Sequence, residues 1–455
     1  MNYNSHIVSS KTKTKFKIID GSVTAPQGFL AAGVFCDIKR LGTGKGSNKG
    51  QKRDLALIVS EVPATVAGMF TTCQVCAAPV KVCVERVRGG TAQAIVANSG
   101  NANACTGARG LKDARDMTAM AAELLRMPAN QVLVASTGRI GVHLPMSNVR
   151  KGISAAVGWL DNSRPSSAQA AEAIMTSDTR AKEVAVEFSL GGKRVRIGGT
   201  CKGAGMIQPG MSATGARPPA SPSKGLHATM LGFITTDAAI DAKSLQSALA
   251  DAVANSFNRI TVDGDMSTND TVIVLANGLA GNSQLKKGSA GLAAFQSALN
   301  HVCLALAQMM VRDGEGASRF VTVKVHGAAS FADADAAARA VANSSLVKTS
   351  WCGGDPNWGR VLAALGYSPA RVVEEKIDVA YRSPNNRKLL FALKKGRPTA
   401  VPFKTLCQIV AEKEFELHIN LNLGKHATVI YASDLTEEYV DFNKGDVSDP
   451  ASMGG

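Results

Sequence analysis

A threonine in the middle of the chain has neighbours that suit covalent chemistry. Thr229 follows the small residue Ala228 and begins an apolar stretch. A threonine hydroxyl is a weak nucleophile until a base takes its proton. Cleavage of the Ala228–Thr229 bond would supply that base, because the freed α-amino group has a pKa of about 8 and lies close to the hydroxyl. A threonine that opens a buried strand is more often structural, so the residues alone leave both interpretations open.

Six sequence blocks in a fixed order accompany this threonine. They are N-S-G-N-A-N-A (98–104), S-T-G-R-I-G (136–141), K-G-A-G-M-I-Q-P (202–209), A-T-M-L-G-F-I-T-T-D-A (228–238), I-T-V-D-G-D-M-S-T-N-D-T (260–271) and G-D-P-N-W-G-R (354–360). With these blocks the chain resembles ornithine acetyltransferase, also called the bifunctional glutamate N-acetyltransferase of arginine biosynthesis. The resemblance extends from about residue 21 to residue 448. Several blocks in one order are far more specific than any single motif.

The resemblance implies a reaction and a set of residues for it. Acetyl would pass from N-acetyl-L-ornithine to L-glutamate through an acetyl-Thr229 intermediate, after self-cleavage between Ala228 and Thr229. Thr137 and Gly138 match the oxyanion hole, whose donors stabilise the tetrahedral intermediate of acyl transfer. The substrate-binding positions of the family fall on Thr176, Lys202, Thr229, Glu315, Asn443 and Ser448.

The elements that must position these residues alternate between strands and helices. Short β-branched or apolar stretches predict strands, and apolar residues at three- and four-residue spacing predict helices. The predicted strands are 55–60, 92–97, 131–135, 184–188, 195–197, 271–276, 320–325 and 427–431. The predicted helices are 114–125, 166–175, 242–256, 291–311 and 334–343. The sequence therefore predicts an α/β fold, and the resemblance makes it a self-cleaving fold of the N-terminal-nucleophile type with layered sheets and helices.

The resemblance also predicts how the chain is divided. Residues 1–20 form a basic extension, 21–228 a first fragment and 229–455 a second fragment that begins with the nucleophile. Two copies of each fragment are expected to associate. Residues 212–227 are an insertion relative to the family, and we expect it to be a passive loop because it contains three prolines and two glycines. The family also ends in a threonine where Ser448 stands here with seven residues after it.

Composition excludes several classes of protein. The chain has 455 residues, 45% of them hydrophobic, and its net charge of +15 comes from 51 basic and 36 acidic residues. Much of that excess lies in residues 1–53, and no nucleic-acid-binding motif such as a helix-turn-helix or zinc finger accompanies it, so we do not expect nucleic-acid binding. No apolar run approaches a membrane span, and nine cysteines form no disulfide framework. Small-molecule substrates are the expected partners.

Several alternatives stay open at this point. An aminopeptidase or amidase with the same kind of nucleophile would use water as the acceptor, and a non-catalytic basic binding protein would leave the chain uncut. No cofactor or metal is predicted, because Asp263, Asp265, Asn269 and Asp270 lack the spacing of a calcium loop. Acetyl-CoA stays open as a second acetyl donor. Residues 1–20 are either a transit segment, which would place the protein in the chloroplast stroma or mitochondrial matrix, or a plain tail, which would leave it in the cytoplasm.

Overall fold

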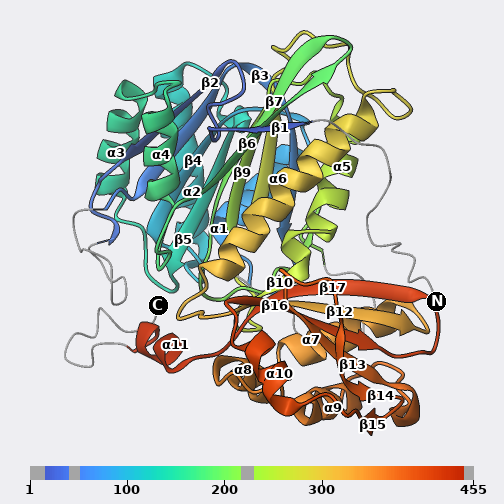
Figure 1. The fold of residues 1–455 in the computed structure, drawn as a ribbon. Helices are drawn as coiled ribbons and strands as arrows, with labels where there is room; N and C mark the ends of the chain where they lie inside the picture. The colour runs from blue at the N-terminus through green and yellow to red at the C-terminus, as the bar shows by residue number, and fades with distance from the viewer. Residues whose placement is uncertain (1–15, 40–51, 217–229, 445–455) are drawn as a thin grey trace.

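The computed structural model describes residues 16–39, 52–216 and 230–444, and it arranges them as two β-sheets with helices packed on them (Figure 1). Ala228, Thr229 and Ser448, which the sequence analysis singled out, lie outside these ranges. The predicted extension 1–20 is described from residue 16 onward, and its residues Lys17–Ile19 form a strand that pairs with the larger sheet, so this part of the extension is not a tail.

The larger sheet contains ten strands among the described residues. Across the sheet their order is β1 (Lys17–Ile19), β6 (Lys182–Leu190), β7 (Lys193–Lys202), β9 (Leu231–Thr236), β11 (Thr271–Ala276), β3 (Leu55–Thr71), β4 (Thr91–Asn101) and β5 (Val132–Arg139), while β2 (Phe29–Val34) and β8 (Met211–Ser212) pair with β3. The two strands that come after residue 228, β9 and β11, therefore lie side by side in the middle of a sheet whose other strands come before it. Ser212 belongs to β8 and pairs with Phe70, so the irregular loop begins one residue later than the sequence suggested.

The strand that follows the candidate nucleophile is central to this sheet. Every residue of β9 is buried, because β7 and β11 pair with its two edges and its side chains pack into hydrophobic clusters on both faces. A strand buried on both faces needs a continuous apolar run, which the residues from Leu231 to Ile234 provide. Lys202, the last residue of β7, lies opposite Leu231 in the register. The start of β9 is thus fixed against the end of β7.

Two hydrophobic clusters hold helices against the larger sheet. The first contains residues of α1 (Ala78–Val87), α2 (Gly107–Leu125), α3 (Met146–Gly158) and α4 (Arg164–Ala173). The second contains residues of α5 (Ala242–Ala254) and α6 (Leu292–Arg312). The expectation that no apolar run approaches a membrane span needs correction, because in the part of the chain that the structure describes α6 is the one helix long and apolar enough to cross a membrane. Its apolar residues are buried against β6, β7 and α5, so packing in the core accounts for its composition.

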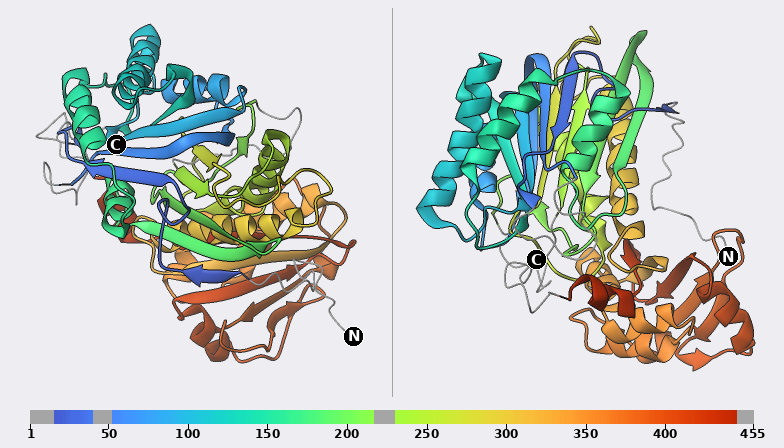
Figure 2. Two further views of the ribbon diagram at one scale, coloured as in Figure 1. Left: turned by 90° about the horizontal axis from the view of Figure 1, so that it is seen from above. Right: turned by 90° about the vertical axis from the view of Figure 1, so that its left-hand side faces the viewer.

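A smaller domain is built on the second sheet, which Figure 2 shows at one end of the larger sheet. Its strand order is β10 (Ile260–Thr261), β17 (His426–Ser433), β12 (Phe320–Ala328), β16 (Glu414–Asn420), β13 (Asp378–Arg382), β14 (Leu390–Lys394) and β15 (Arg397–Pro398). The helices that follow or interrupt these strands are α7 (Phe331–Ala342), α8 (Ser345–Cys352), α9 (Trp358–Gly366), α10 (Phe403–Val410) and α11 (Glu437–Phe442). A third hydrophobic cluster packs four helices, α7, α8, α9 and α10, against this sheet.

The predicted α/β organisation is confirmed. Each predicted strand overlaps an observed strand, and each predicted helix overlaps an observed helix. The sequence analysis missed several elements, which are the half-buried strand β16, the strands β1, β2, β13 and β14, the two-residue strands, and the helices α1, α3, α8, α9, α10 and α11. In β16, polar residues alternate with buried ones, so a search for continuous apolar stretches passes over it.

Candidate active site

The pair predicted to form the oxyanion hole lies at the end of β5, next to β4. Thr137 is fully buried. Gly138 has φ of +124°, in the region that favours glycine, and a Cβ there would lie 2.4 Å from the main-chain carbonyl carbon of Gly100. No other residue fits where these two strands approach so closely. The fold therefore holds a threonine and a glycine side by side in a single conformation.

A buried lysine joins this pair to a second threonine. Lys202 donates hydrogen bonds from Nζ to Thr137 Oγ1 over 3.2 Å and to Thr176 Oγ1 over 2.8 Å. Its side chain is almost fully buried, and this burial lowers the pKa of Lys202, although the charge of Asp178 opposes the shift. An ammonium has three N–H donors. Two of them are directed to threonine hydroxyls, which leaves one for a ligand.

A buried ion network stands behind these residues. Lys182 lies between the carboxylates of Asp178, at 2.5 Å, and Asp313. Asp178 also accepts hydrogen bonds from the main-chain N–H groups of Thr176, at 3.0 Å, and Gly203, at 2.7 Å. Burial alone would raise the pKa of Asp178, but the charges of Lys182 and Lys202 and the Gly203 N–H lower it well below its usual value. Asp178 therefore stays ionised and holds both segments in place.

A glutamate and an asparagine form a second polar group nearby. Glu315 follows α6, and its main-chain N–H donates to the carbonyl oxygen of Ala204 over 2.9 Å. Asn443, just after α11, donates from Nδ2 to Glu315 Oε2 over 3.0 Å. A Cβ on Gly205 would lie 2.5 Å from the Glu315 carboxylate, so a glycine there leaves room for this side chain. The charge of Glu315 also raises the pKa of Lys202, so the two charged groups lie within electrostatic range of each other.

The described chain resumes next to the candidate nucleophile at Met230. Its main-chain N–H donates to Oδ1 of Asp270 over 2.6 Å, and both residues are fully buried. Burial raises the pKa of Asp270 well above its usual value, while the Met230 N–H and the charge of Lys202 lower it. The carboxyl group of Asp270 thus lies beside the peptide that follows Thr229.

The structure brings five of the predicted site residues into two neighbouring groups. Thr137, Thr176 and Lys202 form one, and Glu315 and Asn443 form the other. The sequence analysis assigned no role to Asp178, Lys182, Asp313 or Asp270. Asp178 and Asp313 each lie two positions from a predicted residue, which was a usable signal. Nothing in the sequence pointed to Lys182, because its partner Asp313 is 131 positions away.

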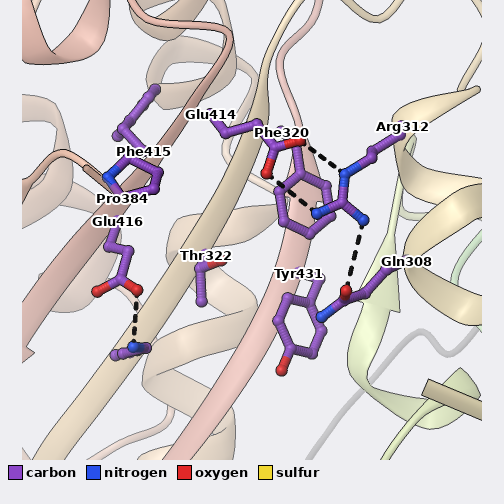
Figure 3. Close-up of a pocket in the computed structure, with 10 residues that line it drawn as sticks. Gln308, Arg312, Phe320, Thr322, Pro384, Glu414, Phe415, Glu416 and Tyr431 are labelled. Carbon is purple, nitrogen blue, oxygen red and sulfur yellow. Dashed lines mark hydrogen bonds and ion pairs between the residues drawn. The ribbon is translucent and has the colours of Figure 1, made fainter. Parts of the chain in front are cut away.

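A hollow of about 260 Å³ on the second sheet is separate from these groups (Figure 3). Arg312 lies over the ring of Phe320, 3.9 Å from its centre, and pairs with both oxygens of Glu414 at 2.7 and 3.0 Å. Lys324 pairs with Glu416 at 3.0 Å. These charges neutralise one another, and none of the predicted site residues lines the hollow.

Comparison with known proteins decides the family. The family model described as the ArgJ family matches residues 33–445. The chain belongs to the ArgJ family. The arginine biosynthesis bifunctional protein ArgJ of Symbiobacterium thermophilum is 47% identical over 423 residues, which cover 93% of this chain and 98% of that protein. The glutamate N-acetyltransferase of Methanocaldococcus jannaschii, another relative, is 44% identical over 432 residues, covering 94% and 98%.

A solved structure is also similar to part of the chain. The ornithine acetyltransferase of Mycobacterium tuberculosis, in complex with ornithine, is 36% identical and covers 44% of this chain and 100% of its own, with a TM-score of 0.39. The family identified from the six sequence blocks is confirmed by the ArgJ family model and the full-length relatives.

Proposed function

We propose that this ArgJ family member transfers acetyl from N-acetyl-L-ornithine to L-glutamate through an acetyl ester on Thr229. The family makes the chain an acyltransferase of arginine biosynthesis that acts on small molecules. The observation that carries the proposal is the buried Lys202, which donates hydrogen bonds to the hydroxyls of both Thr137 and Thr176. Lys202 is the last residue of β7, the strand that pairs with β9.

The chemistry begins with cleavage of the Ala228–Thr229 bond, which frees the α-amino group of Thr229. The Thr229 hydroxyl oxygen attacks the acetyl carbonyl carbon while its proton passes to that amino group. The tetrahedral intermediate collapses with loss of ornithine, whose amine takes the proton. The α-amine of glutamate then attacks the acetyl ester by the same route, which gives N-acetylglutamate and restores the hydroxyl. Both half-reactions share one site, so ping-pong kinetics are expected.

Lys202 determines which way the Thr137 hydroxyl can donate. An N–H of Lys202 donates to the Thr137 oxygen, so the hydroxyl hydrogen must point away from the lysine. It is then available to the negative oxygen that develops during acyl transfer, together with the N–H of Gly138. Prearranged donors of this kind are worth about 3 to 4 kcal/mol each in a dry site.

The second polar group suits the amino-acid part of the substrates. Glu315 provides a carboxylate for the ornithine ammonium, and Asn443 holds it in place through the hydrogen bond to Oε2. The third N–H of Lys202 and the hydroxyl of Thr176 suit a carboxylate or an amide oxygen. Ser448 completes the proposed set from the resemblance alone, because it lies outside the described residues.

An assay with three parallel reactions tests the proposal. Purified protein is incubated with N-acetylornithine plus glutamate, with N-acetylornithine in water, and with acetyl-CoA plus glutamate. We expect N-acetylglutamate in the first reaction, and its formation in the third would establish the second activity. Ornithine released equally fast without glutamate would make the protein an amidase instead. Mass spectrometry of the same sample should give a fragment that starts at Thr229, whereas Thr229→Ala should stay uncut and inactive. An intact wild-type chain with full activity would refute the role of Thr229.

We also propose a cytoplasmic location and a complex with two copies of each fragment. The relatives described above come from bacteria and an archaeon, which favours the plain tail over the transit segment for residues 1–20. The copy number follows from the family resemblance, and the mass of the native protein in solution tests it.

A further inference from the structure

One buried carboxyl group beside the site has no role in the proposed chemistry. Asp270 stands just before β11, and none of its surface is exposed. Oδ1 accepts the Met230 N–H. Among the described residues Oδ2 accepts no hydrogen bond, although the main-chain N–H of Ser267 lies close enough to favour the charged form. A buried carboxyl oxygen without a donor is costly, so this atom needs a partner.

Cleavage before Thr229 creates a donor at this place. The N–H that Asp270 holds belongs to the peptide that joins Thr229 to Met230. The α-amino nitrogen of Thr229 is three covalent bonds away from that amide nitrogen, so bond geometry alone keeps the two within about 4 Å of each other. Before cleavage this nitrogen is an amide with a single hydrogen, and afterwards it is an amine that carries two or three. The amide hydrogen is fixed in the peptide plane, whereas the hydrogens of the amine can rotate toward the carboxyl oxygen that lacks a donor.

We propose that Asp270 is a positioning residue, whose Oδ1 fixes the peptide after Thr229 and whose Oδ2 accepts a hydrogen bond from the freed α-amino group. This inference rests on the proposed function, since it takes Thr229 as the N-terminal nucleophile. The hydrogen bond directs the amine lone pair toward the Thr229 hydroxyl, whose proton the amine must accept. The hydrogen bond from the amine forms only after cleavage, so it serves acetyl transfer, whereas the bond from the Met230 N–H is present before cleavage as well.

The charges around Asp270 set the expected effect on the amine. Burial favours the neutral form of Asp270, whereas the charge of Lys202 and a protonated amine beside Oδ2 favour the carboxylate. That carboxylate in turn stabilises the protonated amine and so raises the pKa of the amine. Lys202 on β7 is the charged side chain of the described structure that acts on Asp270, and Lys202 itself is surrounded by Asp178, Lys182 and Glu315. Because the amine must be neutral to act as a base, activity falls as the pH drops through its pKa. Removing the carboxylate should therefore shift the acidic side of the pH profile to lower pH.

The first test compares Asp270→Asn with Asp237→Asn. Asparagine keeps the carbonyl oxygen for the Met230 N–H but offers an NH₂ group in place of Oδ2. Asp237 is a matched control at the other end of β9: it is also buried, it accepts the N–H groups of Gln27 and Arg196, and burial likewise raises its pKa. We expect Asp270→Asn to be cleaved but to lose about tenfold to a hundredfold in kcat, with KM changed less than threefold and the acidic side of the profile at lower pH. Asp237→Asn should keep the wild-type profile and kcat.

Three results of this comparison would overturn the inference. The first is an unchanged pH profile for Asp270→Asn. The second is an Asp270→Asn chain that stays uncut although its circular dichroism is native, and the third is the same change in kcat and pH profile in both variants.

A second test uses the wild-type protein and does not depend on a variant that folds. The α-amino group of Thr229 is labelled with an amine-reactive reagent at a series of pH values, and mass spectrometry of the Thr229 peptide gives its pKa. We expect a value above the ordinary 8 or so of an α-amino group. An ordinary or lower value overturns the role of Asp270 even when transfer to glutamate is normal. A raised value without acetyl transfer would support Asp270 and refute the proposed function.

Discussion

Replacing Lys182 with methionine tests whether the buried ion network holds the active site together. Methionine keeps most of the length of the side chain and removes its charge. The side chains of Lys182, Asp178 and Asp313 are only 1%, 0% and 3% exposed, so solvent screens none of these charges. Removing one partner of a buried ion pair costs about 3 to 5 kcal/mol. We expect the free energy of unfolding to fall by that amount, because two carboxylates are left in the core without a cation between them.

The pH dependence of this loss follows from the pKa of Asp178. In the wild type that pKa is lowered, so the group contributes stability above its unfolded pKa of about 3.9, and this contribution disappears as the pH falls through the folded pKa. In Lys182→Met the largest lowering influence is gone and burial raises the pKa of Asp178. The folded variant then takes up a proton before the unfolded chain does. The difference in the free energy of unfolding between wild type and variant should therefore be largest near neutral pH and become smaller as the pH approaches about 4.

Denaturant unfolding followed by circular dichroism measures this loss. The experiment uses the Thr229→Ala background, in which the chain is expected to stay in one piece. Lys112→Met is the matched control, because Lys112 pairs with Asp116 on the surface of α2 at 2.5 Å, with side chains 73% and 38% exposed. The control should lose no more than about 0.5 kcal/mol. A loss below about 1 kcal/mol for Lys182→Met, or a gap that widens toward low pH, would refute the reasoning.

Further predictions concern the two polar groups and the inserted loop. Thr137→Ala should lower kcat by about 10²–10³-fold with little change in KM, and a change in KM alone would make Thr137 a ground-state contact. Gly205→Ala should raise KM for N-acetylornithine about tenfold or more, because the new Cβ would lie 2.5 Å from the Glu315 carboxylate; an unchanged KM would remove Glu315 from the substrate site. Deleting residues 213–227 should leave cleavage and transfer within about tenfold, since loop closure costs little with length, and a folded but uncut product would contradict the interpretation as a passive loop.

Much of the fold could be predicted from local sequence patterns. The central strands of the larger sheet read as apolar runs because they are buried, as β9 is, whereas the largely exposed edge strand β1 gave no such signal. The long helices α5, α6 and α7 read as periodic stretches because one side of each packs on a sheet. The alternating strand β16 and the two-residue strands could not be read in this way, since their pairing depends on distant partners.

The sequence by itself also determined the family, because six blocks in one order identified it, and it named the residues Thr137, Thr176, Lys202, Glu315 and Asn443. Only the tertiary structure showed that Lys202 donates to two threonines, that Lys182 lies between two carboxylates, and that one oxygen of Asp270 accepts no hydrogen bond from the described residues. The type of a residue fixes which charge it can carry and how many hydrogen bonds it can make. Its burial and its partners, which residues far away in the chain provide, decide its pKa and whether those bonds are satisfied.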